Sequence, residues 1–221
     1  MIRAGAAAAI AAITVISAVA RTGAADERGT LVDNASVSVE RIRLDAGASQ
    51  RVAAVGTPAL IVQLTPGDVD LAIGGERSSG PRDPGAIAYV PAGRSASARN
   101  IAQRGATDIV IIRFKPGRAP APSMPPVNAP PGIERTELLD NRDTRVVRVQ
   151  FSTTGREPVH THPYDLITLQ ISSGLVEILD GETKTTEPRE PGFVKFVPRD
   201  RPHAYASADA KPFEILSVAV K

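Results

Sequence analysis

Short segments in which apolar and polar residues alternate fill most of the chain after residue 30. Residues 60–64, 145–151 and 175–179 are examples, rich in Val, Ile and Leu. Gly, Pro, Asp and Asn separate such segments at intervals of about ten residues, which is typical of β-strands joined by turns. No stretch after Ala25 has the period of a sustained amphipathic helix. The pattern predicts an all-β fold, an antiparallel sandwich or barrel.

The pattern of strands and turns occurs twice, with a constant offset of 107 residues. The matched pairs run without a gap from Leu31 and Leu138 through Gly67 and Gly174 to Pro91 and Pro198. Chance rarely produces so long a constant register, so we interpret it as a duplication that gives two copies of one fold, residues 30–115 and 132–221. The stretch between them, residues 116–131, contains seven prolines and is predicted to be an extended linker.

The N-terminal segment has the composition of a targeting signal. Arg3 supplies a basic start, residues 4–20 are an unbroken run of apolar and small residues, and residues 18–20 fit the small-x-small cleavage rule. We expect residues 1–25 to be a signal peptide and the folded protein to be periplasmic or secreted. The alternative is an uncleaved membrane anchor, since the apolar run is nearly long enough to span a bilayer. After cleavage, no stable membrane insertion is expected.

Composition and charge exclude several functional classes. The formal net charge is +2, basic and acidic residues are interspersed, and the chain has three Tyr, five Phe and no Trp. A nucleic-acid-binding surface needs a clustered basic face or a platform of aromatic rings, so no nucleic-acid partner is expected. The chain has no Cys, which excludes disulfides, thiolate metal sites and Cys nucleophiles. No Gly-x-Ser-x-Gly elbow, phosphate-binding loop or dinucleotide glycine motif is present.

The three histidines of the chain have spacings that suit a metal site: His160, His162 and His203. On a β-strand, residues two apart point to the same face, with Cα atoms roughly 6.5 Å apart. A His-x-His pair therefore aims two imidazoles into one space, and a third His on a returning strand completes the set while leaving coordination positions open. Such ligands suit one divalent transition metal, Fe, Ni, Cu, Zn or Mn, and the residue types do not select among these metals.

The residues around these histidines resemble the two sequence motifs of the cupin superfamily. The residues that match are Gly155, His160, His162 and Gly174 in the first motif, and Gly192, Pro198 and His203 in the second. The departures are Leu166 or Ile167 in the place of a metal-binding Glu, Asp200 in the place of a Gly, and Ser207 in the place of an Asn. The resemblance implies two jelly-roll barrels in tandem and a bound metal. It does not imply a reaction, because cupins host many chemistries.

The first copy serves as an internal control for the second. The positions equivalent to the three histidines are Ala53, Val55 and Ala96, none of which binds a metal. We therefore expect a degenerate, metal-free N-terminal cupin domain and a metal-binding C-terminal one. Gln63 and Gln170 occur in both copies, which favours a buried structural amide for Gln170 over a role beside the metal.

Two further residues are candidates for the site. Tyr205 lies two positions after His203 and shares its inward face on a regular strand, so it is either a catalytic hydrogen-bond donor to a substrate or an aromatic plug of the barrel mouth. Asp165 is the carboxylate nearest to the vacant Glu position, and its interpretations are a replacement ligand, a partner that orients an imidazole, or a turn residue. A shift of one residue along a strand points a side chain to the opposite face, which favours the turn.

The neighbours of the motif residues carry weaker expectations. Leu166 and Thr168 alternate along the strand that follows the histidine pair, so they are expected to line the cavity. Arg156 and Glu157 lie near the rim and are expected to be solvated surface charges.

Three functional classes remain open on these observations. The first is a metal-dependent dioxygenase acting on a small acidic or enolisable organic compound, because anionic ligands offset the charge that three neutral imidazoles leave on a metal. The second is a non-catalytic cupin that binds or senses a small ligand, and the third is a structural domain braced by its metal. The partner in the first two classes is a small molecule. A homodimer is a further hypothesis, because exposed strand edges need covering.

Overall fold

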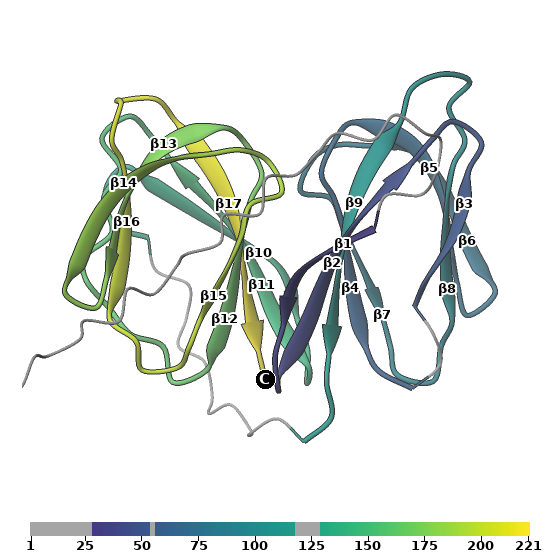
Figure 1. Ribbon diagram of the computed structural model, residues 1–221, viewed down its shortest axis with the longest axis horizontal. Helices are drawn as coiled ribbons and strands as arrows, with labels where there is room; N and C mark the ends of the chain where they lie inside the picture. The colour runs from purple at the N-terminus through teal and green to yellow at the C-terminus, as the bar shows by residue number, and fades with distance from the viewer. Residues whose placement is uncertain (1–27, 54–55, 118–128) are drawn as a thin grey trace, which may run out of the picture.

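The computed structural model describes residues 28–53, 56–117 and 129–221, which form seventeen strands and no helix (Figure 1). Every strand pairing among them is antiparallel. The all-β prediction is therefore confirmed. None of the described residues belongs to a helix that is long and apolar enough to cross a membrane. Some predictions fall outside the described residues, namely the signal peptide at residues 1–25, Val55, and residues 118–128 of the linker.

The first half of the chain is a sandwich of two sheets. Its strands are β1 (Arg28–Asp33), β2 (Val37–Leu44), β3 (Ser49–Ala53), β4 (Ala59–Gln63), β5 (Gly67–Ile73), β6 (Glu76–Arg82), β7 (Ile87–Val90), β8 (Ala96–Asn100) and β9 (Thr107–Phe114). One sheet has five strands in the order β1-β2-β9-β4-β7, and the other has four in the order β3-β8-β5-β6. Buried aliphatic side chains from both sheets form its core, among them Ile42, Val69 and Ile111. We call this half the N-terminal sandwich.

The second half, the C-terminal sandwich, repeats this arrangement with one strand fewer. Its strands are β10 (Ile133–Asp140), β11 (Thr144–Phe151), β12 (Asp165–Gln170), β13 (Gly174–Asp180), β14 (Thr183–Arg189), β15 (Val194–Val197), β16 (His203–Ser207) and β17 (Phe213–Val220). The five-stranded sheet has the order β10-β11-β17-β12-β15, and the smaller sheet has the order β14-β13-β16. In both halves the two sheets stay separate, so each half is an open sandwich of jelly-roll type and not the closed barrel that the cupin resemblance implied.

Corresponding strands of the two sandwiches keep the offset of the sequence repeat. Strand β2 corresponds to β11, and β8 to β16, each at 107 residues. The last strands, β9 and β17, are offset by 106 residues, because the preceding loop is one residue shorter in the C-terminal sandwich. The two halves therefore share their topology, and the origin of this likeness in a duplication stays a prediction.

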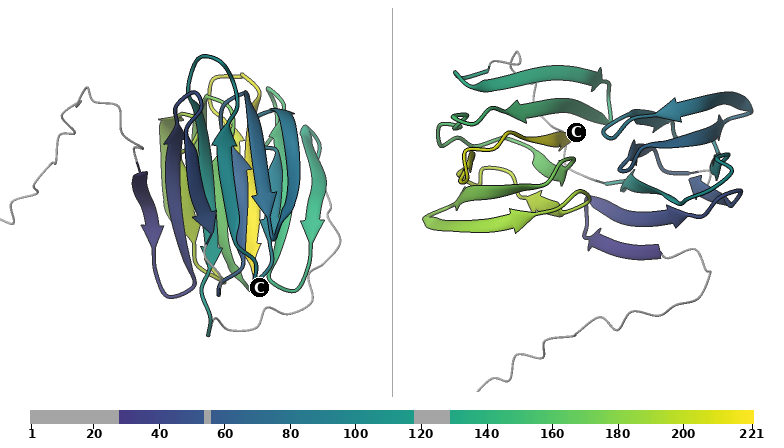
Figure 2. Two further views of the ribbon diagram at one scale, coloured as in Figure 1. Left: turned by 90° about the vertical axis from the view of Figure 1, so that its right-hand side faces the viewer. Right: turned by 90° about the horizontal axis from the view of Figure 1, so that it is seen from above.

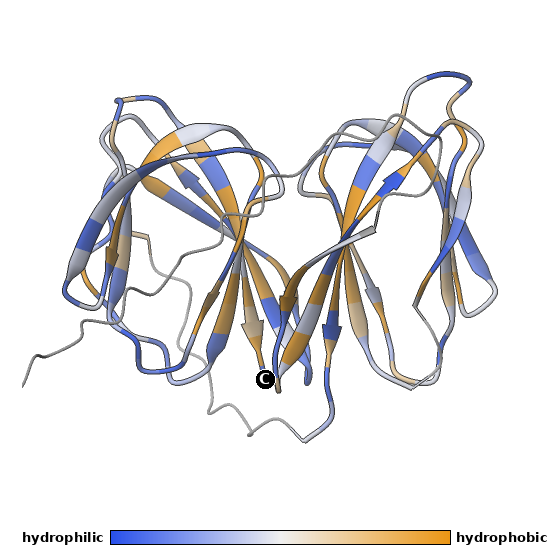
Figure 3. Cartoon of the chain, in the orientation of Figure 1, coloured by the Kyte–Doolittle hydropathy of each residue, from blue (hydrophilic) through white to orange (hydrophobic). Residues whose placement is uncertain are grey.

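The two five-stranded sheets pack against each other through their outer faces, in the middle of the molecule (Figures 1 and 2). Fully buried residues from both halves form this central cluster: Val39, Leu60, Val62, Ile112 and Phe114 from the first, and Val146, Ile167, Leu169, Leu216 and Val218 from the second. Strands β4 and β12 consequently have buried residues on both faces, which explains the four consecutive apolar residues that begin β4 (Figure 3). In β12 the buried residues include the polar Thr168 and Gln170.

Two glycines let the loops of one sandwich approach the other. Gly85 has a φ of 78°, and a Cβ there would lie 2.7 Å from Nη2 of Arg148 across the interface. Gly192, its equivalent, has a φ of 89°, and a Cβ there would lie 3.1 Å from Nη1 of Arg41. Because Arg41 and Arg148 are also equivalent positions, the same contact occurs in both directions. The two halves therefore meet with an approximate twofold relation, like the subunits of a symmetric dimer.

Candidate metal centre

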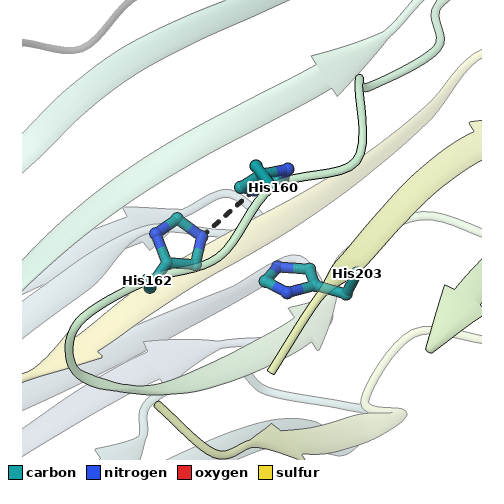
Figure 4. A group of neighbouring side chains, drawn as sticks. All are labelled: His160, His162 and His203. Carbon is teal, nitrogen blue, oxygen red and sulfur yellow. Dashed lines mark hydrogen bonds between the residues drawn. The ribbon is translucent and has the colours of Figure 1, made fainter. Parts of the chain in front are cut away.

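The three histidines of the chain converge on one point of the C-terminal sandwich (Figure 4). His203 is the first residue of β16, His160 lies opposite it in the segment 156–160, and His162 follows in the loop that leads to β12. One ring nitrogen from each histidine lies within 4.8 Å of those of the other two. The Nε2 atoms of His160 and His162 are 3.1 Å apart. A single ion can bind three nitrogens that lie so close together.

The backbone fixes the positions of all three residues. The amide of His160 donates to the carbonyl of His203 over 3.1 Å, and the amide of His203 donates back to the carbonyl of His160 over 2.9 Å. The carbonyl of His162 accepts a hydrogen bond of 2.6 Å from the amide of Asp200. Asp200 has a φ of 59°, a left-handed conformation that favours Gly and that Asp tolerates better than most residues. It occupies the position at which the cupin motif has a Gly, so the turn keeps the geometry that the motif implies.

Backbone carbonyls orient two of the three imidazoles. Nδ1 of His160 lies 2.9 Å from the carbonyl oxygen of Pro158, and Nδ1 of His203 lies 3.0 Å from that of Arg201. A proton on each Nδ1 satisfies these carbonyls, which leaves the lone pair of each Nε2 directed away from the backbone and free for a metal. The donor set therefore fits a divalent transition metal.

Burial favours the neutral form of two of the imidazoles, those of His162 and His203, by lowering their pKa values. It lowers the pKa of His162 to about 3, with His160 and His203 as further causes. Burial also lowers the pKa of His203, against an opposing effect of its hydrogen bond to the carbonyl of Arg201. A neutral imidazole is the form that binds a metal, so at neutral pH no proton has to leave these two rings first.

The segment 156–160 explains why only one half has this site. Its equivalent in the N-terminal sandwich is strand β3, which pairs with β8 through a register shift between Arg51 and Ala53 and in which Val52 is fully buried. In the C-terminal sandwich, only isolated β-bridges join the segment 156–160 to β16, and Pro158 has no amide to donate to a neighbouring strand. Val159, the equivalent of Val52, is consequently 58% exposed. In the N-terminal sandwich, Ala96 at the position of His203 is part of the buried apolar core.

The histidines lie in the wall of a cavity of about 550 Å³ inside the C-terminal sandwich, a volume that suits a small organic molecule. Leu166 and Thr168 line it as expected. Tyr205 lines it too, with its hydroxyl 3.4 Å from Oγ1 of Thr168 and its ring centroid 5.9 Å from that of His203. Arg135 and Arg145 line the same wall, and their guanidinium groups form ion pairs with Glu157 and Glu137. The cavity therefore combines apolar surface with cationic and hydrogen-bonding groups.

The expectation of a solvated Glu157 is wrong. Its side chain is only 5% exposed, and its carboxylate accepts from Nη2 of Arg135 over 2.5 Å and from the amide of Tyr205 over 3.2 Å. The expectation rested on the usual exposure of charged residues near a rim, whereas the irregular backbone at Pro158 turns Glu157 inward. The proline itself was the available signal, because it interrupts strand pairing. Arg156 is exposed as expected and forms an ion pair with Glu177.

The remaining candidates bind to other parts of the protein. Asp165 accepts a hydrogen bond from Oγ of Ser36 in the N-terminal sandwich over 2.8 Å and another from the amide of Arg199 over 3.1 Å. Gln170 donates to the carbonyl of Ser172 over 2.7 Å. Gln63 donates to the carbonyl of Thr65 over the same distance, so both glutamines close the turn after their strand.

No family model matches the sequence, and no curated protein matches it significantly. Many solved structures match the fold. A cupin 2 conserved barrel domain protein from Leptotrichia buccalis has a TM-score of 0.63 at 13% identity, with 92% of both chains covered. AerE from Microcystis aeruginosa has a TM-score of 0.67 at 11% identity, covering 89% of this chain and 98% of that one. At these identities the likeness shows the fold, which is that of the cupins.

The neighbours also include an enzyme of this fold. Salicylate 1,2-dioxygenase from Pseudaminobacter salicylatoxidans has a TM-score of 0.66 at 9% identity, covering 84% of this chain and 71% of that one. A variant of that dioxygenase in complex with gentisate matches at a TM-score of 0.65 and 9% identity, with 84% of this chain and 69% of that chain covered. The fold therefore accommodates aromatic acids in at least one protein.

Proposed function

We propose that this chain is an extracytoplasmic two-domain cupin whose C-terminal sandwich binds one divalent transition metal through His160, His162 and His203. The observation that carries the proposal is the convergence of three imidazole nitrogens within 4.8 Å in the wall of a cavity of about 550 Å³. Fe, Ni, Cu, Zn and Mn all accept such ligands. The proposed location outside the cytoplasm rests on the composition of residues 1–25 alone.

We propose further that the function is a dioxygenase-type oxidation of a small acidic or enolisable compound. A redox-active metal such as Fe(II), held by three ligands with open positions, would supply the chemistry that brings dioxygen and substrate together. The protein's own groups act on the substrate. Arg135 and Arg145 line the cavity wall, ion-paired with Glu157 and Glu137, and they are the basic residues there that an anionic substrate would share with these carboxylates. Tyr205 and Thr168 offer hydroxyl groups that hold a substrate oxygen by hydrogen bonds.

Oxygen uptake tests this proposal. The protein is loaded anaerobically with Fe(II) and offered salicylate, gentisate, catechols, flavonols and β-diketones in turn. We expect uptake with at least one anionic substrate, abolished in His160→Ala and reduced mainly through a higher KM in Arg145→Gln. The absence of uptake throughout, or equal uptake in His160→Ala, contradicts the dioxygenase.

A second candidate function, the binding or sensing of a small acidic ligand without catalysis, has one observation in its favour. Among the described residues that line the cavity, Glu157 is the carboxylate, and both of its oxygens already accept hydrogen bonds. The cavity wall therefore offers no carboxylate poised as a general base. Retention of an acidic ligand by the metal-loaded protein, unchanged after exposure to air, would favour this function.

A further inference from the structure

Asp165 joins the N-terminal sandwich to the loops that carry the histidines. It is the first residue of β12, three positions after His162, and its side chain is only 14% exposed. One carboxylate oxygen accepts from Oγ of Ser36, which belongs to the turn between β1 and β2 of the other sandwich. The other oxygen accepts from the amide of Arg199, in the loop before His203. A single carboxylate thus connects three segments that are far apart in the sequence.

The contact at Arg199 leads directly to the metal ligands. The next residue, Asp200, donates its amide to the carbonyl of His162. One residue further, the carbonyl of Arg201 accepts from Nδ1 of His203 and fixes its ring. A change in the position of Arg199 therefore displaces the backbone hydrogen bond to His162. It also displaces the carbonyl of Arg201, which orients the ring of His203.

Ser36 is itself held in a rigid turn. Oδ1 of Asn34 accepts from the amides of Ser36 and Val37 over 2.8 and 2.9 Å, so the serine hydroxyl is presented at a fixed place. The equivalent turn in the C-terminal sandwich, closed by Asn141, presents Asp143, which accepts a hydrogen bond from the hydroxyl of Tyr89. Each sandwich thus reaches across the interface from the same turn. Only the contact made by Ser36 ends at the histidine loops.

We infer that the metal-free N-terminal sandwich positions the metal centre of its neighbour, with Ser36 and Asp165 as the positioning residues. This inference rests on the proposed metal site and adds a role for the half that lacks ligands. The hydrogen bond from Ser36 fixes Asp165, and Asp165 fixes the turn at Arg199 that sets the relative positions of His162 and His203. Neither residue binds the metal.

Cobalt(II) titration of the full chain tests this role, because the visible absorption of bound Co(II) reports on coordination geometry. Asp165→Ala should weaken Co(II) binding about 10- to 100-fold. This range is typical when a residue that orients a metal ligand through hydrogen bonds is removed. Ser36→Ala should weaken it in the same direction by a smaller factor and shift the absorption bands, and Ser36→Thr should restore both. Tyr89→Phe is the matched control, because it removes the corresponding contact of the other turn and should leave affinity and spectrum unchanged.

The outcomes separate this inference from the proposed metal site. If the unmodified protein binds no Co(II), the metal site itself is wrong and the positioning role falls with it. If the unmodified protein binds Co(II) and Ser36→Ala and Asp165→Ala match it in affinity and spectrum, the metal site stands and the positioning role is overturned. A loss of thermal stability in these variants without a spectral change, as expected for Tyr89→Phe, also overturns it. Changed spectra in folded Ser36→Ala, with rescue by Thr, support it.

Discussion

At the scale of the residue, three histidine side chains form the proposed metal site of the C-terminal sandwich. The rings of His160, His162 and His203 meet because backbone hydrogen bonds join the segment that carries the first two to the strand that carries the third. The spacing of the histidines predicted this convergence, but it placed the first two on a strand, whereas His160 forms an isolated bridge and His162 lies in a loop. Their orienting partners were not predictable, because these are carbonyls of Pro158 and Arg201 and any residue type supplies a carbonyl.

The first prediction ranks two residues near the metal. His203→Ala removes one of three ligands and should weaken metal binding by more than ~100-fold, whereas Asp165→Ala, which acts through the backbone, should stay within about 10- to 100-fold. Competition with a chromophoric chelator measures both affinities. Abolished binding in Asp165→Ala together with intact binding in His203→Ala would show that the ligand assignment is wrong.

The second prediction concerns the pH dependence of the metal-free protein. The folded pKa of His162 is about 3 and that of His203 is also lowered, so between about 3 and the ordinary histidine pKa of about 6.5 the unfolded chain binds more protons than the folded one. The free energy of unfolding should therefore rise with pH across this window and fall as the pH drops, with an upper limit of ~1.4 kcal/mol per pH unit for each histidine. Urea unfolding at several pH values measures the slope, and His162→Gln should make it shallower.

At the scale of the element, the turn at Asp200 and the segment 156–160 shape the site. The strands and their repeat followed from the sequence, because alternation and turn residues are local signals. The irregular segment did not follow, since its inward and outward residues depend on a pairing with β16 that is broken at Pro158. Glu157, which was expected to be a solvated surface charge, is buried in this segment. The left-handed turn, in contrast, was detectable as the Gly position of the cupin motif.

The third prediction tests that turn. Asp200→Gly relieves a φ of 59° and should raise the free energy of unfolding by up to about 1 kcal/mol, after allowance for the greater freedom of Gly in the unfolded chain. Asp200→Val should lower it, because a β-branched residue suits a positive φ poorly. Ala210→Gly, at the other non-glycine residue with positive φ (54°) among those described, is the control. If Ala210→Gly raises the free energy of unfolding and Asp200→Gly lowers it, the Asp200 side chain stabilises the fold by more than its positive φ destabilises it.

At the scale of the whole molecule, the two sandwiches form one folded unit around the cluster between their five-stranded sheets. The apolar run of β4 carried this information, because a strand that is apolar on both faces must be covered twice. The sequence could not identify the covering surface, since a second copy of the chain would bury the same residues. The structure supplies the answer: each half covers the other.

The fourth prediction follows from this shared core. Leu216 is fully buried between the sandwiches, and Leu216→Ala should lower the free energy of unfolding by about 2–5 kcal/mol. Because the cluster belongs to both halves, the loss should appear as one shifted transition followed alike by tyrosine fluorescence and circular dichroism. Two separate transitions in the unmodified protein would show that the halves fold independently.

The last prediction concerns metal content. The chain should bind about one divalent metal, because the histidines all lie in the C-terminal sandwich and the position of His203 is occupied in the N-terminal sandwich by Ala96, within a packed apolar core. Elemental analysis of the full chain after loading and removal of excess metal measures the ratio, with His160→Ala/His162→Ala/His203→Ala as the control that should bind none. A ratio of two would place a second site in the N-terminal sandwich, where the structure provides no imidazole. Metal retained by the triple variant would place the site elsewhere than at the histidines.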